Sequence, residues 1–225
     1  MFSSLKIALS MRVVDAHGYK EYRDALAQDW FNLFNEWEIT PICIPNVIKN
    51  IEPLVSMADM VILTGGDDIA LDFNNNIINN IEKHKKQRDI QEYRIIDACI
   101  KNNITVLGVC RGMQLINYRF GGTLRALDPQ KHVCKEHKIN IIEGDFIKKR
   151  ISVNSYHNNG VFMDTLGKDL KILAVSEDSS IEAISHTKYP ILGIMWHPER
   201  SVPFSKEDKE MLLNFIQNSL GEEND

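Results

Sequence analysis

Ile104-Thr-Val-Leu-Gly-Val-Cys-Arg-Gly-Met-Gln114 is the stretch of this chain that decides its fold. The residues up to Val109 form an apolar, β-branched run of strand length, and a helix-forming segment follows at once. Cys110 therefore lies at a strand-to-helix turn, with Gly108 and Gly112 two residues to either side. A strained turn of this kind accepts only small residues at those two positions. The stretch predicts a nucleophile elbow with cysteine in place of serine.

The elbow bears on the reactivity of the Cys110 thiol. A free cysteine has a pKa near ~8.5, and the first turn of a helix stabilises a negative charge by roughly 0.3–2 kcal/mol. Because one pKa unit corresponds to about 1.4 kcal/mol, the helix lowers the thiol pKa by about one unit at most. A basic partner is still required.

A second stretch, Ile191-Leu-Gly-Ile-Met-Trp-His-Pro-Glu199, offers that partner. Side chains two residues apart on a strand point the same way, so we expect His197 and Glu199 to face one another at a strand end. A carboxylate fixes the tautomer of an imidazole and favours the imidazolium, while the imidazole takes the thiol proton. Cys110, His197 and Glu199 are the candidate nucleophile, base and orienting acid.

Apolar runs of strand length alternate with helical patterns in the first half of the chain. We expect strands at 5–11, 41–44 and 58–63 and an amphipathic helix at 21–37. Such alternation is typical of a parallel sheet with right-handed crossovers, whose functional residues gather at the carboxyl ends of the strands. The loop Thr64–Asp68 and the elbow both follow strands, so we expect them to approach one another.

The second half of the chain changes pattern. Short strands at 138–142, 152–153, 171–175, 181–184 and 191–195 predict an antiparallel excursion, and a last helix at 205–220 has Ser205 as its N-cap. The fold class predicted is α/β, a flavodoxin-like, mostly parallel sheet flanked by helices, with a small antiparallel excursion in the C-terminal half. With 225 residues and no convincing linker, we expect one domain over 1–225.

Composition narrows the class of function. The formal net charge of −5 argues against a general nucleic-acid binder. No secretory leader pattern opens the chain and no apolar run approaches the ~18 residues of a membrane helix, so we expect a cytoplasmic protein that binds neither nucleic acid nor membrane. The four cysteines show no zinc-ligand spacing, and Cys43 and Cys99 are expected to be core residues.

A basic run at 83–88 follows an Asn-rich loop at 74–80. It is interpreted as a solvated face, with a site for anionic substrate groups as the alternative. Asp89 and Glu92 stand at capping-box spacing before an apolar run, which predicts a structural role at the start of a helix.

The two informative stretches together resemble the class I glutamine amidotransferase superfamily. Four further motifs resemble its stand-alone γ-glutamyl hydrolase branch: Thr64-Gly-Gly-Asp-Asp68, Arg88-Asp89, Phe120-Gly-Gly-Thr-Leu124 and Val153-Asn-Ser-Tyr-His157. The resemblance implies that Cys110 attacks the γ-carbonyl of a small γ-glutamyl amide and forms a thioester, with His197 as base and then acid, and Glu199 orienting it.

The same resemblance implies the remaining site residues. The oxyanion would be met by the backbone N–H groups of Gly66 and Arg111. Substrate-binding positions would be Gly65, Gln114 and the loop Asn154, Ser155, Tyr156 and His157. No metal or cofactor is implied, because the cysteine mechanism is complete without one.

Two other interpretations stay open at this point. The same triad serves glutaminase subunits that deliver ammonia to a separate synthase partner, and the sequence does not exclude such a partner. A non-catalytic binding module on the same fold is the third, since fold does not imply function. The sequence leaves the oligomeric state open.

Overall fold

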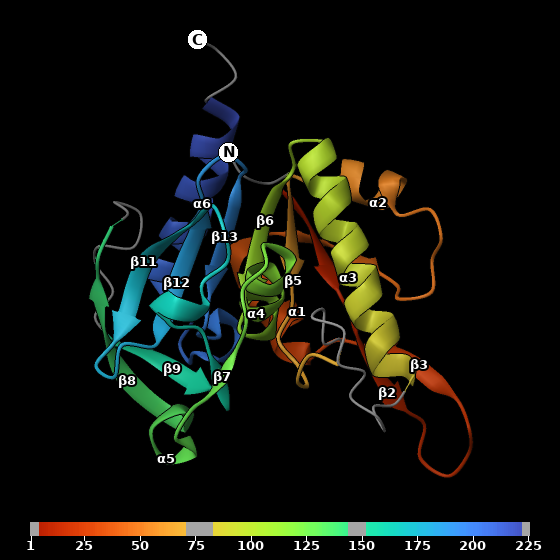
Figure 1. The fold of residues 1–225 in the computed structure, drawn as a ribbon. Coiled ribbons are helices and arrows are strands. Elements are labelled where there is room, and N and C mark those ends of the chain that lie inside the picture. The colour runs from red at the N-terminus through yellow and green to blue at the C-terminus, as the bar shows by residue number, and fades with distance from the viewer. Residues whose placement is uncertain (1–4, 71–82, 144–151, 222–225) are drawn as a thin grey trace.

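A nine-stranded sheet forms the centre of the computed structural model, which describes residues 5–70, 83–143 and 152–221 (Figure 1). Five strands on one side of this sheet run parallel. In spatial order they are β4 (Thr40–Ile44), β1 (Lys6–Ser10), β5 (Met60–Leu63), β6 (Thr105–Val109) and β13 (Ile191–Ile194). Numbered along the chain, their order is 2-1-3-4-5, the flavodoxin-like arrangement.

The remaining strands of the large sheet are antiparallel. They are β12 (Ile181–His186), β11 (Leu170–Ser176), β8 (Val133–Ile141) and β9 (Ser152–Tyr156). Two small ribbons pair β2 (Arg12–Asp15) with β3 (Tyr22–Ala25) and β7 (Arg125–Ala126) with β10 (Asn159–Gly160). The predicted fold class, with its antiparallel excursion in the second half, is confirmed.

Helices cover both faces of the sheet. They are α1 (Gln28–Trp37), α2 (Glu52–Ser56), α3 (Lys83–Lys101), α4 (Arg111–Arg119), α5 (Pro129–His132) and α6 (Lys206–Gly221), with 3₁₀ turns η2 (Met163–Thr165) and η3 (Pro198–Arg200). Alternate side chains of the parallel strands enter two separate apolar cores. One core packs against α1 and α6, and the other packs against α2, α3 and α4.

Two expectations about local structure are corrected. The helix predicted from residue 21 begins at Gln28, because Tyr22–Ala25 pairs with β2 as strand β3. Cys43 is exposed rather than a core residue, since β4 is an edge strand with one uncovered flank, whereas Cys99 is buried as expected. The cap of α6 is confirmed by the hydrogen bond from the Asp208 backbone N–H to the Ser205 hydroxyl, at 3.1 Å.

Candidate active site

The elbow has the strained backbone that the sequence predicts. Cys110 has φ 51° and ψ −104° between β6 and α4, and it is 6% exposed. Its backbone N–H donates to the carbonyl of Ile194 at 2.7 Å, which fixes the turn to β13. A Cβ on Gly108 would lie 2.5 Å from Ile116 Cδ1, and one on Gly112 would overlap the carbonyl of Leu63. Both glycines are therefore required by close packing as well as by the turn.

His197 and Glu199 face one another as predicted, with His197 Nδ1 2.7 Å from Glu199 Oε1. The structural reason is different from the predicted one. Strand β13 ends at Ile194, and the pair belongs to a 3₁₀ turn at Pro198–Arg200 for which His197 is the N-cap. The proline begins this turn, and the turn brings the carboxylate back onto the imidazole. Both side chains are almost fully buried.

The electrostatics of His197 favour the imidazolium. Burial alone would lower its pKa, but hydrogen bonds to Cys110 and Glu199 and the negative charges of these two groups raise the pKa to about 9. An imidazole with this pKa holds a proton taken from a thiol at neutral pH. The electrostatics of His197 therefore couple it to Cys110 on one side, and the 2.7 Å contact couples it to Glu199 on the other.

Strand β9 holds the backbone of His197 in place. The Asn154 side chain accepts from the His197 N–H and donates to the His197 carbonyl, both at 2.8 Å. The Tyr156 ring stands edge-on to the imidazole with 5.6 Å between ring centroids, and the Arg200 guanidinium lies over the Tyr156 ring. Asn154 and Tyr156, both predicted substrate-binding positions, are thus brought to His197.

The loop after β5 approaches the same histidine, which confirms that the two strand ends meet. A Cβ on Gly65 would lie 2.6 Å from His197 Cε1, and a Cβ on Gly66 would overlap the Arg88 guanidinium. Glycine at both positions lets the backbone pass between the imidazole and Arg88. The N–H of Arg111, the first residue of α4, has no partner within the helix and is placed at the elbow.

A buried ionic network lies beneath the elbow and the loop. The Arg111 guanidinium contacts the carboxylates of Asp89 and Glu92, and Arg88 Nε donates to Glu92 Oε1 at 2.9 Å. All four side chains are 5% exposed or less. Burial acts to raise the pKa of Glu92, but the charges of Arg111 and Arg88 lower it. We call these four residues the arginine network.

The arginine network fixes the backbone of the glycine loop. Arg88 Nη2 donates to the carbonyls of Thr64 and Gly65, at 2.7 and 3.2 Å. The Ser10 hydroxyl accepts from the Thr64 N–H and donates to Glu92 Oε1. Side chains from other parts of the chain therefore hold the backbone of the glycine loop in place.

Two sequence interpretations in this region are corrected. Asp89 and Glu92 are structural but form no capping box, because α3 begins at Lys83 and they lie in its second and third turns. Arg88 belongs to no solvated face, since pairing with Glu92 lets it be buried. The side chains of residues 83–85 and the Asn-rich segment 74–80 lie outside the described residues. The sequence did not predict the network because Arg111 is on α4 and its partners Asp89 and Glu92 are on α3, and no local pattern links the two helices.

Gln114 is linked to two loops. Its backbone N–H donates to the Cys110 carbonyl, and its side-chain Nε2 donates to the carbonyl of Asn159 at 2.9 Å. The Asn159 side chain in turn donates to Asp68 Oδ1 at 3.0 Å. Asn159 was not predicted as a site residue, although it follows the quoted Val153–His157 motif by two positions.

Ser155 and His157 belong to a different environment. The Ser155 hydroxyl donates to the carbonyl of His132 at 2.6 Å, and the His157 ring lies 5.0 Å from the His132 ring, centroid to centroid. Because side chains alternate along β9, Ser155 points away from the face that carries Asn154 and Tyr156. The structure therefore gives no support to the expectation that these two side chains contact a glutamyl group.

A pocket of about 590 Å³ opens along β9, and neither His197 nor Cys110 is among the described residues that line it. Asn154, Tyr156 and Arg200 line one part of it, and Lys135 contributes a second cationic side chain. Within the described part of the chain, no helix combines the length and apolar composition that a bilayer crossing requires.

Comparison with known proteins identifies the family. Residues 6–199 match the Peptidase C26 family, and the chain belongs to this class I glutamine amidotransferase family. It is 32% identical to the γ-glutamyl-CDP-amidate hydrolase of Campylobacter jejuni, over 86% of this chain and 90% of that one. It is 33% identical to a subunit of the glutamine-hydrolysing GMP synthase of Pyrococcus abyssi, over 55% of this chain and 65% of that one.

The fold is also found among solved structures. A glutamine amidotransferase of Thermotoga maritima superposes with a TM-score of 0.63 over 98% of this chain and 86% of that chain, at 14% identity. At that identity the likeness concerns the fold alone.

Proposed function

We propose that this protein is a cysteine hydrolase of γ-glutamyl amides. The observation that carries the proposal is the buried contact of His197 with Glu199 at 2.7 Å, in a site where Cys110 stands at the elbow and acts with Glu199 to raise the pKa of His197. Family membership supports the reaction class.

The reaction proceeds in two halves. Cys110 Sγ attacks the γ-carbonyl carbon, and the carbonyl oxygen becomes an oxyanion facing the backbone N–H groups of Gly66 and Arg111. Removing one such donor typically costs about 2.7–4 kcal/mol of transition-state stabilisation. His197 gives its proton to the leaving nitrogen as the C–N bond breaks, which leaves a thioester. His197 then takes a proton from water, which attacks the thioester, and glutamate leaves as the thiol is restored.

The specific substrate we propose is γ-glutamyl-CDP-amidate, giving glutamate and cytidine diphosphoramidate, as in capsule phosphoramidate biosynthesis. The name of the Campylobacter relative supports this choice. The pocket along β9 also supports it: Asn154 and Tyr156, which contact His197, line this pocket, Arg200 and Lys135 supply cations for a pyrophosphate, and Tyr156 supplies an aromatic face. A smaller leaving group such as γ-aminobutyrate would use less of this pocket.

The test is glutamate release by purified protein from γ-glutamyl-CDP-amidate, L-glutamine, γ-glutamyl-γ-aminobutyrate and a γ-glutamyl peptide. We expect kcat/KM to be largest for the nucleotide, with activity abolished in Cys110→Ala. An Arg200→Gln variant is expected to raise KM for the nucleotide more than for L-glutamine. Glutamate release from none of the four compounds would contradict the hydrolase proposal, and a preference for another amide would contradict the nucleotide alone.

The second candidate is a glutaminase subunit of a synthase, which the likeness to the Pyrococcus GMP synthase protein favours. Glutamine hydrolysis that is negligible for the isolated chain and rises sharply with a co-purifying synthase would support it over the stand-alone hydrolase.

A further inference from the structure

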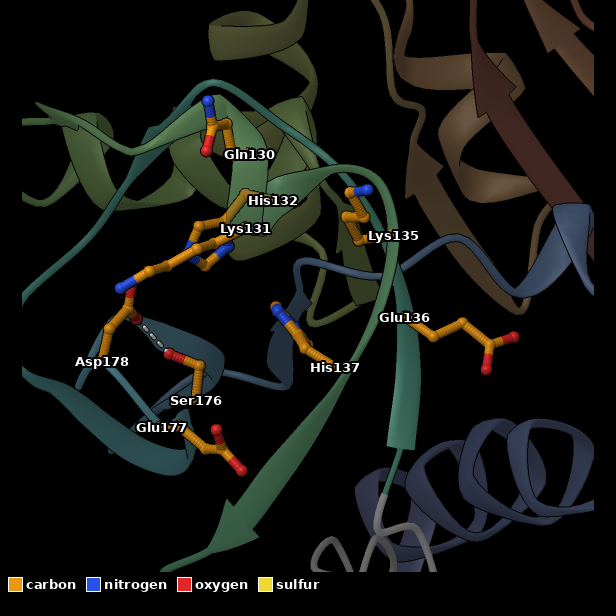
Figure 2. Close-up of a pocket in the computed structure, with 9 residues that line it drawn as sticks. All are labelled: Gln130, Lys131, His132, Lys135, Glu136, His137, Ser176, Glu177 and Asp178. Atoms are coloured by element: carbon orange, nitrogen blue, oxygen red, sulfur yellow. Dashed lines mark hydrogen bonds and ion pairs between the residues drawn. The ribbon is translucent and has the colours of Figure 1, made fainter.

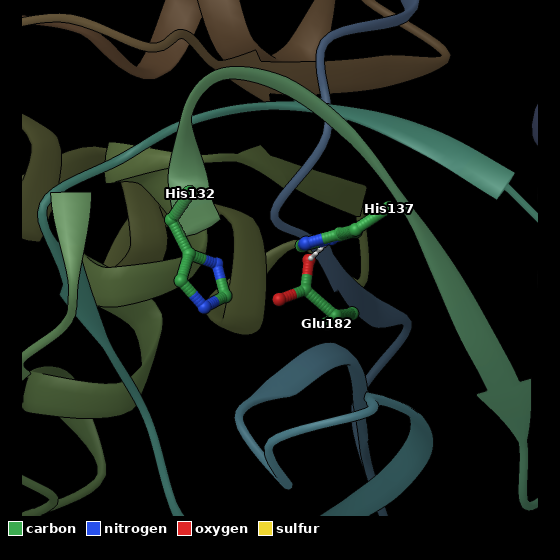
Figure 3. A group of neighbouring side chains, drawn as sticks. All are labelled: His132, His137 and Glu182. Atoms are coloured by element: carbon green, nitrogen blue, oxygen red, sulfur yellow. Dashed lines mark ion pairs between the residues drawn. The ribbon is translucent and has the colours of Figure 1, made fainter. Parts of the chain in front are cut away.

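Strand β9 separates the candidate active site from a second buried cluster, which the reaction does not use. Its members are His132 at the end of α5, His137 on β8, Glu182 on β12 and His157 just after β9; we call it the histidine cluster. The side chains of His132, His157 and Glu182 are 2% exposed or less, and that of His137 is 15% exposed. Figure 3 shows the His132 and His137 rings on either side of the Glu182 carboxylate.

Hydrogen bonds determine which ring nitrogens carry lone pairs. His132 Nε2 lies 2.8 Å from Asp178 Oδ2, and because a carboxylate accepts only, Nε2 holds the proton and Nδ1 carries the lone pair in the neutral ring. His157 Nδ1 donates to the carbonyl of Asn159 at 3.2 Å, so its Nε2 carries the lone pair.

These lone pairs face a carboxylate. His157 Nε2 is 3.8 Å from Glu182 Oε1, and Glu182 Oε2 is 3.3 Å from His137 Nε2. In the described structure, four buried atoms of this cluster have no hydrogen-bond partner: His132 Nδ1, His137 Nε2, His157 Nε2 and Glu182 Oε2. Buried polar groups without hydrogen-bond partners are costly. Ion-pair contacts of 3.3 and 3.8 Å to Glu182, rather than hydrogen bonds, hold His137 and His157 here, and such a cluster of imidazoles around a carboxylate has the composition of a cation site.

The spacing of these atoms fits a metal ion. One ligand atom each from His132, His137 and Glu182 lie within 4.8 Å of one another. Tetrahedral Zn²⁺ holds N and O ligands at about 2.0–2.2 Å, which places ligand atoms roughly 3.3–3.6 Å apart. The His137–Glu182 separation of 3.3 Å already meets this value, and small side-chain rotations close the rest.

We propose that His132, His137 and Glu182 bind a divalent transition-metal ion of the Zn²⁺ class. Asp178 behind His132 supplies the carboxylate that commonly orients a ligating imidazole. A water molecule completes the coordination, and His157 Nε2, 3.8 Å from Glu182 Oε1, lies next to this group of three ligands. An open pocket of about 600 Å³, lined by His132 and His137 among others, gives the ion a path from solvent (Figure 2).

The bound ion would fix the strand that holds the candidate base. It ties α5 and β8 to β12 across β11. Strand β8 pairs with β9, and β9 carries Asn154, whose side chain binds the His197 backbone. Metal binding is therefore expected to stiffen the support of His197, although the ion takes no part in the chemistry.

The test is metal binding by the full chain carrying Cys110→Ser, which removes the thiol of the Cys110–His197 pair as a competing ligand. The metal-stripped protein is titrated with Zn²⁺ against a chromophoric chelator, and the Co²⁺ form is examined by absorption. We expect one ion per chain, and a Co²⁺ spectrum of N and O ligands without a thiolate charge-transfer band. Failure to bind a stoichiometric ion, or a thiolate band, overturns the proposal, and neither readout needs a ligand variant to fold.

Variants then assign the ligands. In the same background, His137→Gln and Glu182→Gln are each expected to weaken Zn²⁺ binding at least 100-fold, and Asp178→Asn by about 10–100-fold as an orienting group. His17→Gln is the matched control, because His17 is an exposed histidine outside the cluster, and its affinity should be unchanged. Unchanged affinity in both ligand variants would place the ion elsewhere and overturn the assignment. So would a binding loss in the His17→Gln control equal to that in the ligand variants.

Discussion

Two buried clusters of charged and titratable groups support the candidate site from opposite sides, and they differ in how completely they are paired. In the arginine network every carboxylate oxygen accepts a hydrogen bond, from Arg88, Arg111, Ser10 or the Ala70 N–H. In the histidine cluster four buried polar atoms have no hydrogen-bond partner among the described residues. A network whose hydrogen bonds are all made stabilises the fold. A cluster of imidazoles and a carboxylate with unmade hydrogen bonds indicates a site for a further group.

The largest effect is expected from breaking the complete network. Arg111→Met leaves two buried carboxylates short of a partner, which costs about 3–5 kcal/mol of unfolding free energy. Urea denaturation measures this cost. The matched control is Arg119→Met, which removes a partly exposed pair with Asp97 worth about 0–1 kcal/mol. Equal losses in the two variants would show that the network is no scaffold.

A smaller effect is expected on the other side of the site, where hydrogen bonds hold His197. Asn154→Ala removes both bonds to the His197 backbone and should lower kcat about 10–100-fold with little change in KM, because a misplaced base slows the chemical step. Steady-state kinetics on the best γ-glutamyl substrate measures it. Ser152→Ala, two residues earlier on β9, is the control and should keep its kcat. A rise in KM alone would argue against positioning by Asn154.

The pH dependence tests the charge chain at His197. Its pKa is raised to about 9 in the folded protein, so its contribution to stability is fully present below the ordinary pKa of about 6.5. This contribution is lost as the pH rises through about 9. We expect kcat/KM to fall on an alkaline limb near pH 9, as the proton for the leaving nitrogen is lost.

Glu199→Gln should move that limb to lower pH, because it removes a negative charge that stabilises the imidazolium. Profiles of kcat/KM for both proteins measure the shift. If the alkaline limb of the variant stays at the same pH, Glu199 does not raise the pKa of His197.

The smallest effect is expected in the histidine cluster without metal. With a chelator present at pH 8, Glu182→Gln should cost less than about 1 kcal/mol of unfolding free energy. Among the described residues Ser180 alone donates a well-directed hydrogen bond to this carboxylate, and its ion pair with His137 is a 3.3 Å contact. Urea denaturation in parallel with Arg111→Met measures the contrast. A loss as large as that of Arg111→Met would show that the two clusters are equally complete, and would remove the basis of the comparison.

The sequence by itself determined the elements whose signals are local. The strand-to-helix elbow at Cys110, the proximity of His197 and Glu199, the parallel strands and the cap at Ser205 all follow from neighbours within a few residues. Even the correct His197–Glu199 prediction rested on strand alternation, whereas a 3₁₀ turn after β13 produces the contact.

Tertiary structure decided what depends on pairing between distant segments. Arg88 changed from a predicted surface cation into a buried support of the glycine loop because Glu92 and the Thr64 carbonyl are its partners. His132, His137 and Glu182 carry no motif spacing, and they meet only because β8 and β12 flank β11 in one sheet. Local sequence preferences determine where the chain forms turns, strands and helices. Which polar side chains come into contact is determined by burial and by charge pairing between segments that are distant in the sequence.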